Sequence, residues 1–557
     1  MNVPKEDVRM KPVAIRKEGA VCSAKEALSK IRDGSVVASS GFNMVNTPEY
    51  LFLELMRLYK RTGHPRDLFL IMDSAPSVPG RALDKVAEEM YSSKDTGLIR
   101  GISTPYFGFM PTFQKLVAEN MLEAYSWPMG AAASFFREVA SGRPGVITKI
   151  GLDTSIDPKE GGGRLNKLAE ERNTCTVRRI TIDGEDYLLY EAPKPNFAFV
   201  RATTADEMGN LTMERELFRG TILSIVQAAK AHPNPGYVIA QVERVRKGRA
   251  ADPRAVEVPG PFVDYVVVAP PEFHWQSGSK RYDRRLEIGS PSARIAAKSF
   301  LSAEMEPGER VVAGRVLLEL IKILKDKRAP IVVNLGIGIP ALVSRLATNE
   351  KLSRYITVAL ESGQWGGVAL PGRDFGIAID PFAVSIMPDM FYNFEGGVID
   401  AAALGFLQVG ANGDVNPSMI PGRMYGPGGF PVIAGGSPRL YFAGMFTAGD
   451  SEIDISDGGL RIVRDGKIPK FVDKPLRSFF SGSQALRFGK EVLYMTERAV
   501  FRLTTEGLEL MEVAPGIDVE RDVVSKMGFR PKLAATVKLM DRRLFERAPL
   551  GLAHELK

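Results

Sequence analysis

The chain has 557 residues, of which 45% are apolar and 25% charged. This length favours two to four domains of roughly 100–200 residues each, with enough apolar residues for a sizeable core. The 73 basic and 66 acidic residues leave a net charge of +7. We see no long basic run and no interleaving of aromatic and basic residues, so no nucleic-acid partner is expected. We interpret the mild excess as an ordinary solvated surface, with attraction of anionic small molecules such as CoA as the alternative.

The start of the chain carries no targeting signal. Its first residues lack an apolar signal core and are too acidic for a typical transit peptide. Nowhere does an apolar run approach the ~18–20 residues of a membrane span. The two cysteines, Cys22 and Cys175, form no CxxC pair, which fits a reducing compartment. We therefore expect a cytoplasmic protein with no membrane partner.

Two distant segments share one design, a short buried strand followed by a glycine turn and a helix. The first runs from Val36 to Phe42, with a helix opened by Thr47 and Pro48. The second runs from Pro330 to Gly338, with a helix opened by Pro340. Short β-branched runs suit parallel strands, proline is tolerated in the first helical turn, and threonine is a good N-cap. The repetition predicts two related open α/β domains fused in one chain.

The join between the two halves is expected near residues 295–325. Ala296–Leu301 is predicted as helix, Glu306–Arg310 as a break, and Val311–Asp326 as the first helix of the second half, since its apolar residues recur at helical spacing. We assign residues 1–20 to an N-terminal extension, 21–300 to an N-terminal domain, 301–545 to a C-terminal domain and 546–557 to a tail.

Histidine is scarce, with only His64, His232, His274 and His554. There is no HExxH motif or Cys/His cluster, so no metal site is predicted. We interpret His274, beside Trp275 in a proline-rich stretch, as structural. A Ser-His-Asp or Cys-His system stays open on spacing alone, but no GxSxG elbow marks a serine nucleophile. The scarcity directs attention to carboxylates.

Glu361 is the carboxylate that the pattern favours. The run from Thr357 to Leu360 is predicted as a strand that leads directly into it, and Gly363 follows at once. Glycine there would let a bulky substrate approach the carboxylate, and carboxylates do serve as covalent nucleophiles. On this pattern alone, a helix cap or a salt-bridge partner remains the alternative.

Seven motifs in order resemble the class I CoA-transferases, particularly the long single-chain type that includes propionate and acetate CoA-transferases. They lie between about residues 20 and 545. The motifs are Asp33–Phe42, Val146–Pro158 with Gly161–Asn166, Asp206–Leu211, Val333–Pro340, Glu361–Gly367, Gly444–Gly449 and Ala514–Arg521. Glu361–Gly367 matches the family's active-site pattern Glu-x-Gly-x-x-Gly-Gly.

The resemblance implies a CoA-transferase that moves CoA from an acyl-CoA to a free short- or medium-chain carboxylic acid. Glu361 would be the covalent nucleophile and would carry CoA as a glutamyl thioester in a ping-pong cycle. Coenzyme A would be a substrate, with no tightly bound cofactor and no metal. The resemblance also implies a homodimer or homotetramer. Backbone groups that stabilise the oxyanion would lie at Gly336, Gly338 and Gly449. The substrate or CoA pocket would include Gly41, Met129, Gly363, Trp365, Gly366 and Gly367.

The sequence departs from the family at several of these positions. Met129 stands where the family usually has a glutamine, and its side chain has no N–H donor. Ser40 replaces a glycine, Trp365 a smaller apolar residue, and Asp450 a glycine. Methionine and tryptophan together favour a more apolar pocket. We therefore expect one acyl partner to be larger or more apolar than acetate.

Three other functions remain open at this point. An acyl-CoA hydrolase on the same scaffold would use Glu361 with water in place of the second acid. An inactive ligand-binding homologue is a second alternative, which the intact Glu361 and its flanking glycines argue against. The third is a Rossmann oxidoreductase, suggested by Gly336 and Gly338. Ala341 stands at the third glycine of that motif, which is an allowed variant, but no acidic ribose partner stands out.

Overall fold

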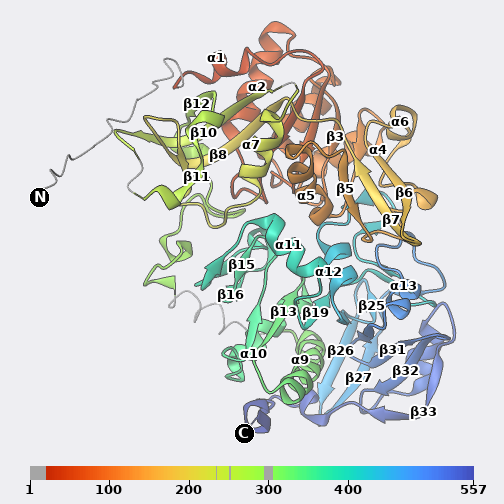
Figure 1. The fold of residues 1–557 in the computed structure, drawn as a ribbon. Coiled ribbons are helices and arrows are strands. Elements are labelled where there is room, and N and C mark those ends of the chain that lie inside the picture. Colours follow the sequence, from red (N-terminus) through yellow and green to blue (C-terminus); the bar gives the residue numbers. More distant parts are fainter. Residues whose placement is uncertain (1–20, 234, 250–251, 294–304, 557) are drawn as a thin grey trace, which may run out of the picture.

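The computed structural model describes residues 21–233, 235–249, 252–293 and 305–556. The chain forms two α/β halves, with the N-terminal half above the C-terminal half in Figure 1. Each half is built around its own sheet, as the repeated strand-turn-helix design predicts. The N-terminal extension and the helix expected at Ala296–Leu301 lie outside the described residues.

The N-terminal half contains a nine-stranded sheet in the order β11-β9-β8-β1-β2-β3-β4, with β10 beside β8 and β12 beside β10. Strand β1 is central and parallel to both β2 and β8. The strands are β1 (Val36–Ser39), β2 (Leu68–Met72), β3 (Ile99–Ser103), β4 (Glu123–Tyr125), β8 (Phe197–Asp206), β9 (Leu211–Thr212), β10 (Tyr237–Arg246), β11 (Val256–Val258) and β12 (Tyr265–Val268). A separate three-stranded sheet holds β5 (Gly145–Thr148), β6 (Thr176–Ile182) and β7 (Glu185–Glu191).

Helices pack around this sheet because each presents an apolar face to it. In α2, for example, Leu51, Phe52 and Leu55 are buried. The helices of this half are α1 (Ala24–Leu28), α2 (Glu49–Thr62), α3 (Ala82–Ser93), α4 (Pro111–Ala118), α5 (Met129–Ala140), α6 (Lys167–Arg172) and α7 (Ile222–Lys230).

The C-terminal half contains an eight-stranded sheet in the order β14-β13-β19-β24-β30-β31-β32-β33. The strands from β14 to β30 run parallel, and β30, β31 and β32 are joined antiparallel. The strands are β13 (Ile331–Leu335), β14 (Ile356–Val358), β19 (Ala401–Leu404), β24 (Arg439–Ala443), β30 (Glu491–Met495), β31 (Ala499–Thr504), β32 (Gly507–Val513) and β33 (Lys532–Leu539).

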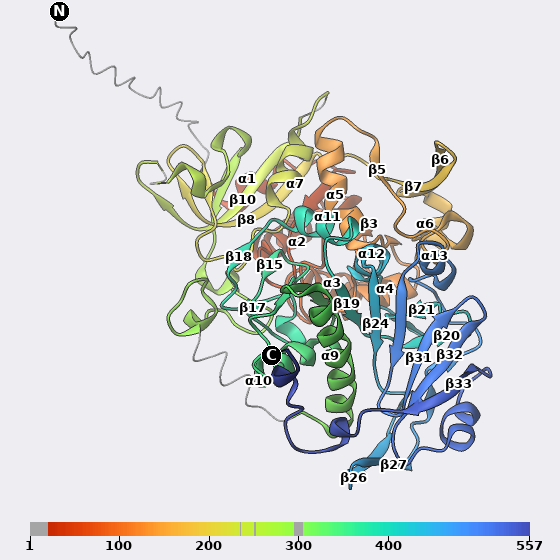
Figure 2. The ribbon, with the colours of Figure 1, turned by 60° about the horizontal axis from the view of Figure 1, so that its bottom comes forward.

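The helices of the C-terminal half are α9 (Pro307–Lys327), α10 (Ile339–Asn349), α11 (Met387–Glu395), α12 (Phe430–Gly436) and α13 (Gly482–Arg487). Helix α9 begins at Pro307, so the predicted break at 306–310 is wrong. Proline and glycine are accepted there because the first turn of a helix needs no N–H from proline. At the C-terminus, Leu552 is buried against this half, and Figure 2 shows that end beside α9.

The two expected strand-turn-helix units are β1 with α2 and β13 with α10. Pro340 lies in the first turn of α10 as predicted. Thr47 is not the N-cap of α2, because Pro48 holds that position. The Thr47 hydroxyl instead donates to the carbonyl of Asn43 at 2.8 Å and so stabilises the turn between β1 and α2.

One hydrophobic cluster spans both halves, beside clusters that belong to a single half. Phe42 and Met129 from the first half belong to the same buried cluster as Phe391 and Phe430 from the second. Helices α5 and α11 pack against each other across the boundary. The side-chain amide of Gln364 also donates to the carbonyl of Leu217 at 2.8 Å. These contacts hold the facing surfaces of the two halves in a fixed relationship.

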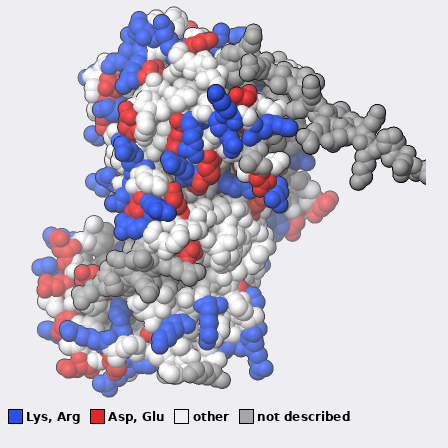
Figure 3. Space-filling view, turned by 90° about the vertical axis from the view of Figure 1, so that its left-hand side faces the viewer, with Lys and Arg blue, Asp and Glu red and all other residues white. Residues whose placement is uncertain are grey.

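The surface charge is dispersed over the face shown in Figure 3, where Lys and Arg lie among Asp and Glu on both halves. None of the helices in the described ranges combines the length and the apolar character that crossing a bilayer requires.

Candidate active site

Glu361 lies in a tight turn, separated from the end of β14 by Ala359 and Leu360. Asn334 of the neighbouring strand β13 donates from Nδ2 to the carbonyl of Ala359 at 2.9 Å. The chain then folds back on itself, since the Leu360 N–H donates to the carbonyl of Gln364 and the Gly366 N–H to that of Val358. The glutamate is therefore presented from a rigid strand end rather than from a free loop.

The glycines after Glu361 build this turn and do not line the cavity that contains Glu361. Gly363 has φ +106, and a Cβ there would lie 2.1 Å from the carbonyl oxygen of Ser385. Gly367 has φ +74, and its Cβ would lie 2.4 Å from the carbonyl oxygen of Ile379. Only glycine tolerates both the backbone conformation and the close approach. The spacing Glu-x-Gly-x-x-Gly-Gly thus reflects how the turn packs on the segment around residues 378–386.

Three further residues expected in the pocket have structural contacts instead. Gly366 lies beside the ring of Phe382, which a Cβ would approach to 2.5 Å. Trp365 donates from Nε1 to the Ser385 hydroxyl at 2.9 Å. Gly41 is closed in by Thr47 and Pro76, at 2.4 Å and 2.7 Å from a Cβ. None of Gly41, Gly363, Trp365, Gly366 and Gly367 lines the cavity that contains Glu361.

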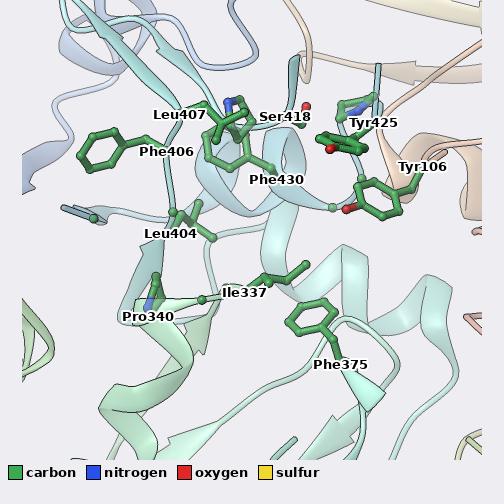
Figure 4. A pocket seen from close by; sticks show the side chains of 18 of the residues that line it. Tyr106, Ile337, Pro340, Phe375, Leu404, Phe406, Leu407, Ser418, Tyr425 and Phe430 are labelled. Carbon is green, nitrogen blue, oxygen red and sulfur yellow. The ribbon is translucent and has the colours of Figure 1, made fainter. Parts of the chain in front are cut away.

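That cavity has a volume of about 680 Å³, within the usual range for small-molecule sites. Both halves contribute to it: Phe42, Tyr106 and Met129 come from the first, and Glu361 and Phe375 from the second. Its labelled side chains are mostly apolar, with Phe406 on one side of Figure 4 and Tyr106 and Tyr425 on the other. Met129, Gly336, Gly338, Glu361 and Gly449, all expected at the site, do line it.

The Glu361 carboxylate lies against the backbone of Gly429, which precedes α12. A Cβ built at Gly429 would lie 2.5 Å from Oε2 of Glu361 and 3.0 Å from Oε1. Burial raises the pKa of the Glu361 carboxyl to about 7, because a poorly solvated site disfavours the charged form. A carboxylate with a raised pKa is a stronger base and nucleophile than an exposed one, yet it is still substantially ionised near neutral pH.

The backbone groups expected to stabilise an oxyanion differ in availability. The Gly336 N–H already donates to the carbonyl of Ala403 at 2.9 Å, so it is occupied by the sheet edge. In the described part of the chain, the N–H groups of Gly338 and Gly449 donate to no backbone carbonyl. Both residues have positive φ and line the cavity. Gly338 and Gly449 therefore fit the oxyanion role better than Gly336 does.

Lys470 is a charged residue of the cavity that no sequence motif singles out. Its side chain is 9% exposed and its ammonium lies 4.0 Å from the centre of the Phe406 ring. Burial lowers the pKa of Lys470 to about 8, which Glu497 partly offsets. Gly429 and Tyr106 were missed as well. Nothing in the sequence indicates that the Gly428–Gly429 pair lies beside Glu361.

His274 is buried in the N-terminal half, outside the cavity that holds Glu361. Burial lowers the pKa of its imidazole to about 3, so the ring is neutral at physiological pH. This agrees with the interpretation of His274 as structural.

Known proteins resemble the chain along nearly its whole length. The coenzyme A transferase family matches residues 21–269. Acetate CoA-transferase YdiF of Escherichia coli K12 is 33% identical over 544 residues, covering 97% of this chain and 98% of that protein. Caffeate CoA-transferase of Acetobacterium woodii is 36% identical over 537 residues, covering 95% and 98%.

A solved structure agrees with these sequence matches. The acyl-CoA transferase YdiF of Escherichia coli O157:H7, in a thioester complex with CoA, superposes with a TM-score of 0.83 at 32% identity, covering 96% of this chain and 97% of that one. The chain therefore combines two fused α/β halves with a carboxylate in the cavity between them. The chain belongs to the coenzyme A transferase family, as a long single-chain class I CoA-transferase.

Family membership excludes the Rossmann oxidoreductase. The turn at Gly336 and Gly338, which suggested a dinucleotide site, lines the same cavity as Glu361. The chain is thus an enzyme that transfers CoA.

Proposed function

We propose that the enzyme moves CoA from an acyl-CoA to a free short- or medium-chain carboxylic acid by a ping-pong mechanism through a thioester on Glu361. The observation that supports this most is the position of the Glu361 carboxylate, which lies in an apolar cavity against Gly429 with a pKa raised to about 7.

In the first half-reaction, a Glu361 carboxylate oxygen attacks the thioester carbonyl carbon. The C–S bond breaks, CoA leaves as its thiolate, and a mixed anhydride remains on Glu361. The thiolate then attacks the glutamyl carbonyl carbon and releases the donor acid as its carboxylate. Glu361 now carries CoA as a thioester, so the free energy of the original thioester is retained.

In the second half-reaction, the acceptor carboxylate attacks the glutamyl thioester and expels the CoA thiolate. The thiolate attacks the acyl carbonyl of the new anhydride, which gives the product acyl-CoA and returns the Glu361 carboxylate. Each attack builds negative charge on a carbonyl oxygen, and the N–H groups of Gly338 and Gly449 are suited to stabilise it. No step needs ATP or a metal ion.

Steady-state kinetics test this cycle. We expect parallel lines in double-reciprocal plots against donor and acceptor, and exchange of labelled free acid into acyl-CoA without a second acid. We also expect acyl-CoA consumption to depend on the acceptor acid. Rapid consumption without any acceptor would instead support the hydrolase, in which water takes the place of the second acid.

We further propose that one acyl partner is larger or more apolar than acetate. Met129 lines the cavity together with Phe42, Ile337 and Phe375, and such a lining favours apolar acyl chains. Turnover across a series of acyl-CoA donors tests this. Strong preference for acetyl-CoA and acetate would contradict it.

A further inference from the structure

The proposed chemistry calls for a hydrogen-bond donor that holds the reacting carboxyl group beside Glu361. Met129 faces the cavity but offers no N–H or O–H, and the Gly336 N–H is occupied by Ala403. The donor must therefore come from another polar side chain that lines the cavity with Glu361.

Tyr106 is such a donor. It lies in the loop between β3 and α4 and lines the cavity with Glu361. Figure 4 shows its hydroxyl directed toward the middle of the pocket, as is that of Tyr425. Burial, with smaller effects of Tyr425 and Glu361, raises the pKa of Tyr106 to about 12. The hydroxyl therefore keeps its proton at physiological pH and can donate a hydrogen bond inside the cavity that it lines with Glu361.

Contacts on both sides fix the position of the Tyr106 ring. The N–H of Phe107 donates to the carbonyl of Tyr425 at 2.6 Å, and the N–H of Gly428 to the carbonyl of Pro105 at 3.0 Å. A Cβ at Gly108 would lie 2.3 Å from the ring, so glycine is needed for its close packing. The loop that carries Tyr106 is thus tied to the loop that carries Gly429, on the other half of the chain.

The same loop also holds Met129 in place. The N–H of Met129 donates to the carbonyl of Gly428 at 2.8 Å. A Cβ at Gly428 would lie 3.8 Å from the Tyr106 ring. Tyr106 and Met129 therefore flank one glycine, next in the chain to the glycine that contacts Glu361. Both residues also line the cavity that holds Glu361.

We propose that the Tyr106 hydroxyl donates a hydrogen bond to the carboxyl or acyl oxygen of the substrate as it reacts with Glu361, and so supplies the donor that Met129 lacks. This rests on the proposed thioester cycle. A donor fixed in advance by packing stabilises developing charge without reorganisation at the moment of reaction.

The experiment compares Tyr106→Phe, Met129→Gln and the double variant in the first half-reaction, measured as the rate of glutamyl-CoA formation. Tyr106→Phe keeps the ring and its packing. We expect it to lower the rate of glutamyl-CoA formation by about a hundredfold to a thousandfold, as loss of one such donor does. Glutamine is close to methionine in length and adds an amide donor, so Met129→Gln should restore much of the rate in the Tyr106→Phe background.

Tyr91→Phe is the matched control, because Tyr91 lies outside the cavity and its hydroxyl binds Glu119. It should leave the rate unchanged. A rate for Tyr106→Phe within twofold of the original enzyme would overturn the proposal, as would a loss that Met129→Gln does not relieve. Melting temperatures of all variants show whether they fold.

The outcome separates this inference from the proposed function. If the unmodified enzyme forms no CoA adduct from acyl-CoA, the thioester cycle itself is wrong. If it forms the adduct and Tyr106→Phe forms it equally fast, the cycle stands and only the role of Tyr106 is wrong.

Discussion

The carboxylate of Glu361 and the backbone of Gly429 occupy adjoining space, such that a Cβ at Gly429 would lie 2.5 Å from Oε2. The backbone at Gly429, with φ −79°, is open to any residue. The glycine is therefore needed for space beside the carboxylate rather than for its conformation.

Gly429→Ala tests this relationship. Because the backbone conformation suits alanine, we expect the fold to persist while the methyl group displaces the carboxylate. Glutamyl-CoA formation should fall by about a hundredfold, since small misplacements of reacting groups are costly. Rapid-quench measurement of adduct formation, with the melting temperature, gives the answer.

Gly396→Ala is a suitable control for that variant. Gly396 has a similar φ of −74° and lies outside the cavity that holds Glu361. It should retain the original rate. An unchanged rate in Gly429→Ala would show that the carboxylate does not react from the position described.

The pH dependence of the first half-reaction follows from Glu361. The nucleophile must be ionised, and the pKa of its carboxyl is raised to about 7. We expect log kcat/KM to rise with a slope near one below pH 7 and to level off above it. A profile that stays flat down to pH 5 would contradict a buried carboxylate nucleophile.

Deprotonation of Lys470 should lower kcat/KM on the alkaline side of the same pH profile. Its buried ammonium, with a pKa of about 8, gives the cavity a positive charge that favours anionic substrates. As pH rises through 8 this charge is lost, so kcat/KM for acyl-CoA should decline. Lys470→Met should remove the alkaline decline and lower kcat/KM several-fold. If the alkaline limb persists in Lys470→Met, another group causes it.

Ionisation of the Glu361 carboxyl should also lower the free energy of unfolding at high pH. Its folded-state pKa of about 7 lies above the ordinary value of 4.5, so the folded state binds more protons than the unfolded state between these pH values. Stability therefore falls as pH rises from about 4.5 to 7. Glu361→Gln should be more stable than the original enzyme by about 1–3 kcal/mol at pH 8, an order of magnitude set by a shift of this size.

Melting temperatures at pH 8 and pH 5 provide the measurement. The advantage of Glu361→Gln should shrink at pH 5, where the original carboxyl is largely protonated. An equal advantage at both pH values would mean that charge burial is not its cause.

The sequence was most informative where a pattern is local. The strands β1 and β13 with their helices followed from apolar runs, glycine turns and proline, and the position of Glu361 after a strand followed in the same way. Local patterns misled at Gly363, Gly366 and Gly367. Their closeness to Glu361 in the chain suggested substrate contact, whereas the turn directs them onto residues 378–386.

No sequence pattern assigned to the site those residues that reach it only through tertiary packing. Gly429 reaches Glu361 because α12 follows a loop tied to the N-terminal half. Lys470 and Tyr106 come from segments without any recognisable motif, and tertiary packing alone brings them to the cavity. The sequence also could not show which glycine N–H groups are free to stabilise an oxyanion. The Gly336 N–H is not, because it bonds to Ala403 across the sheet.

The most direct test of the central claim is peptide mass spectrometry after incubation with acyl-CoA in the absence of an acceptor acid. Hydroxylamine or borohydride treatment then marks the glutamyl thioester. The account predicts that the modification maps to Glu361, and that Glu361→Ala carries no adduct and loses CoA exchange. Full CoA exchange by Glu361→Ala, or an adduct on another residue, would contradict it.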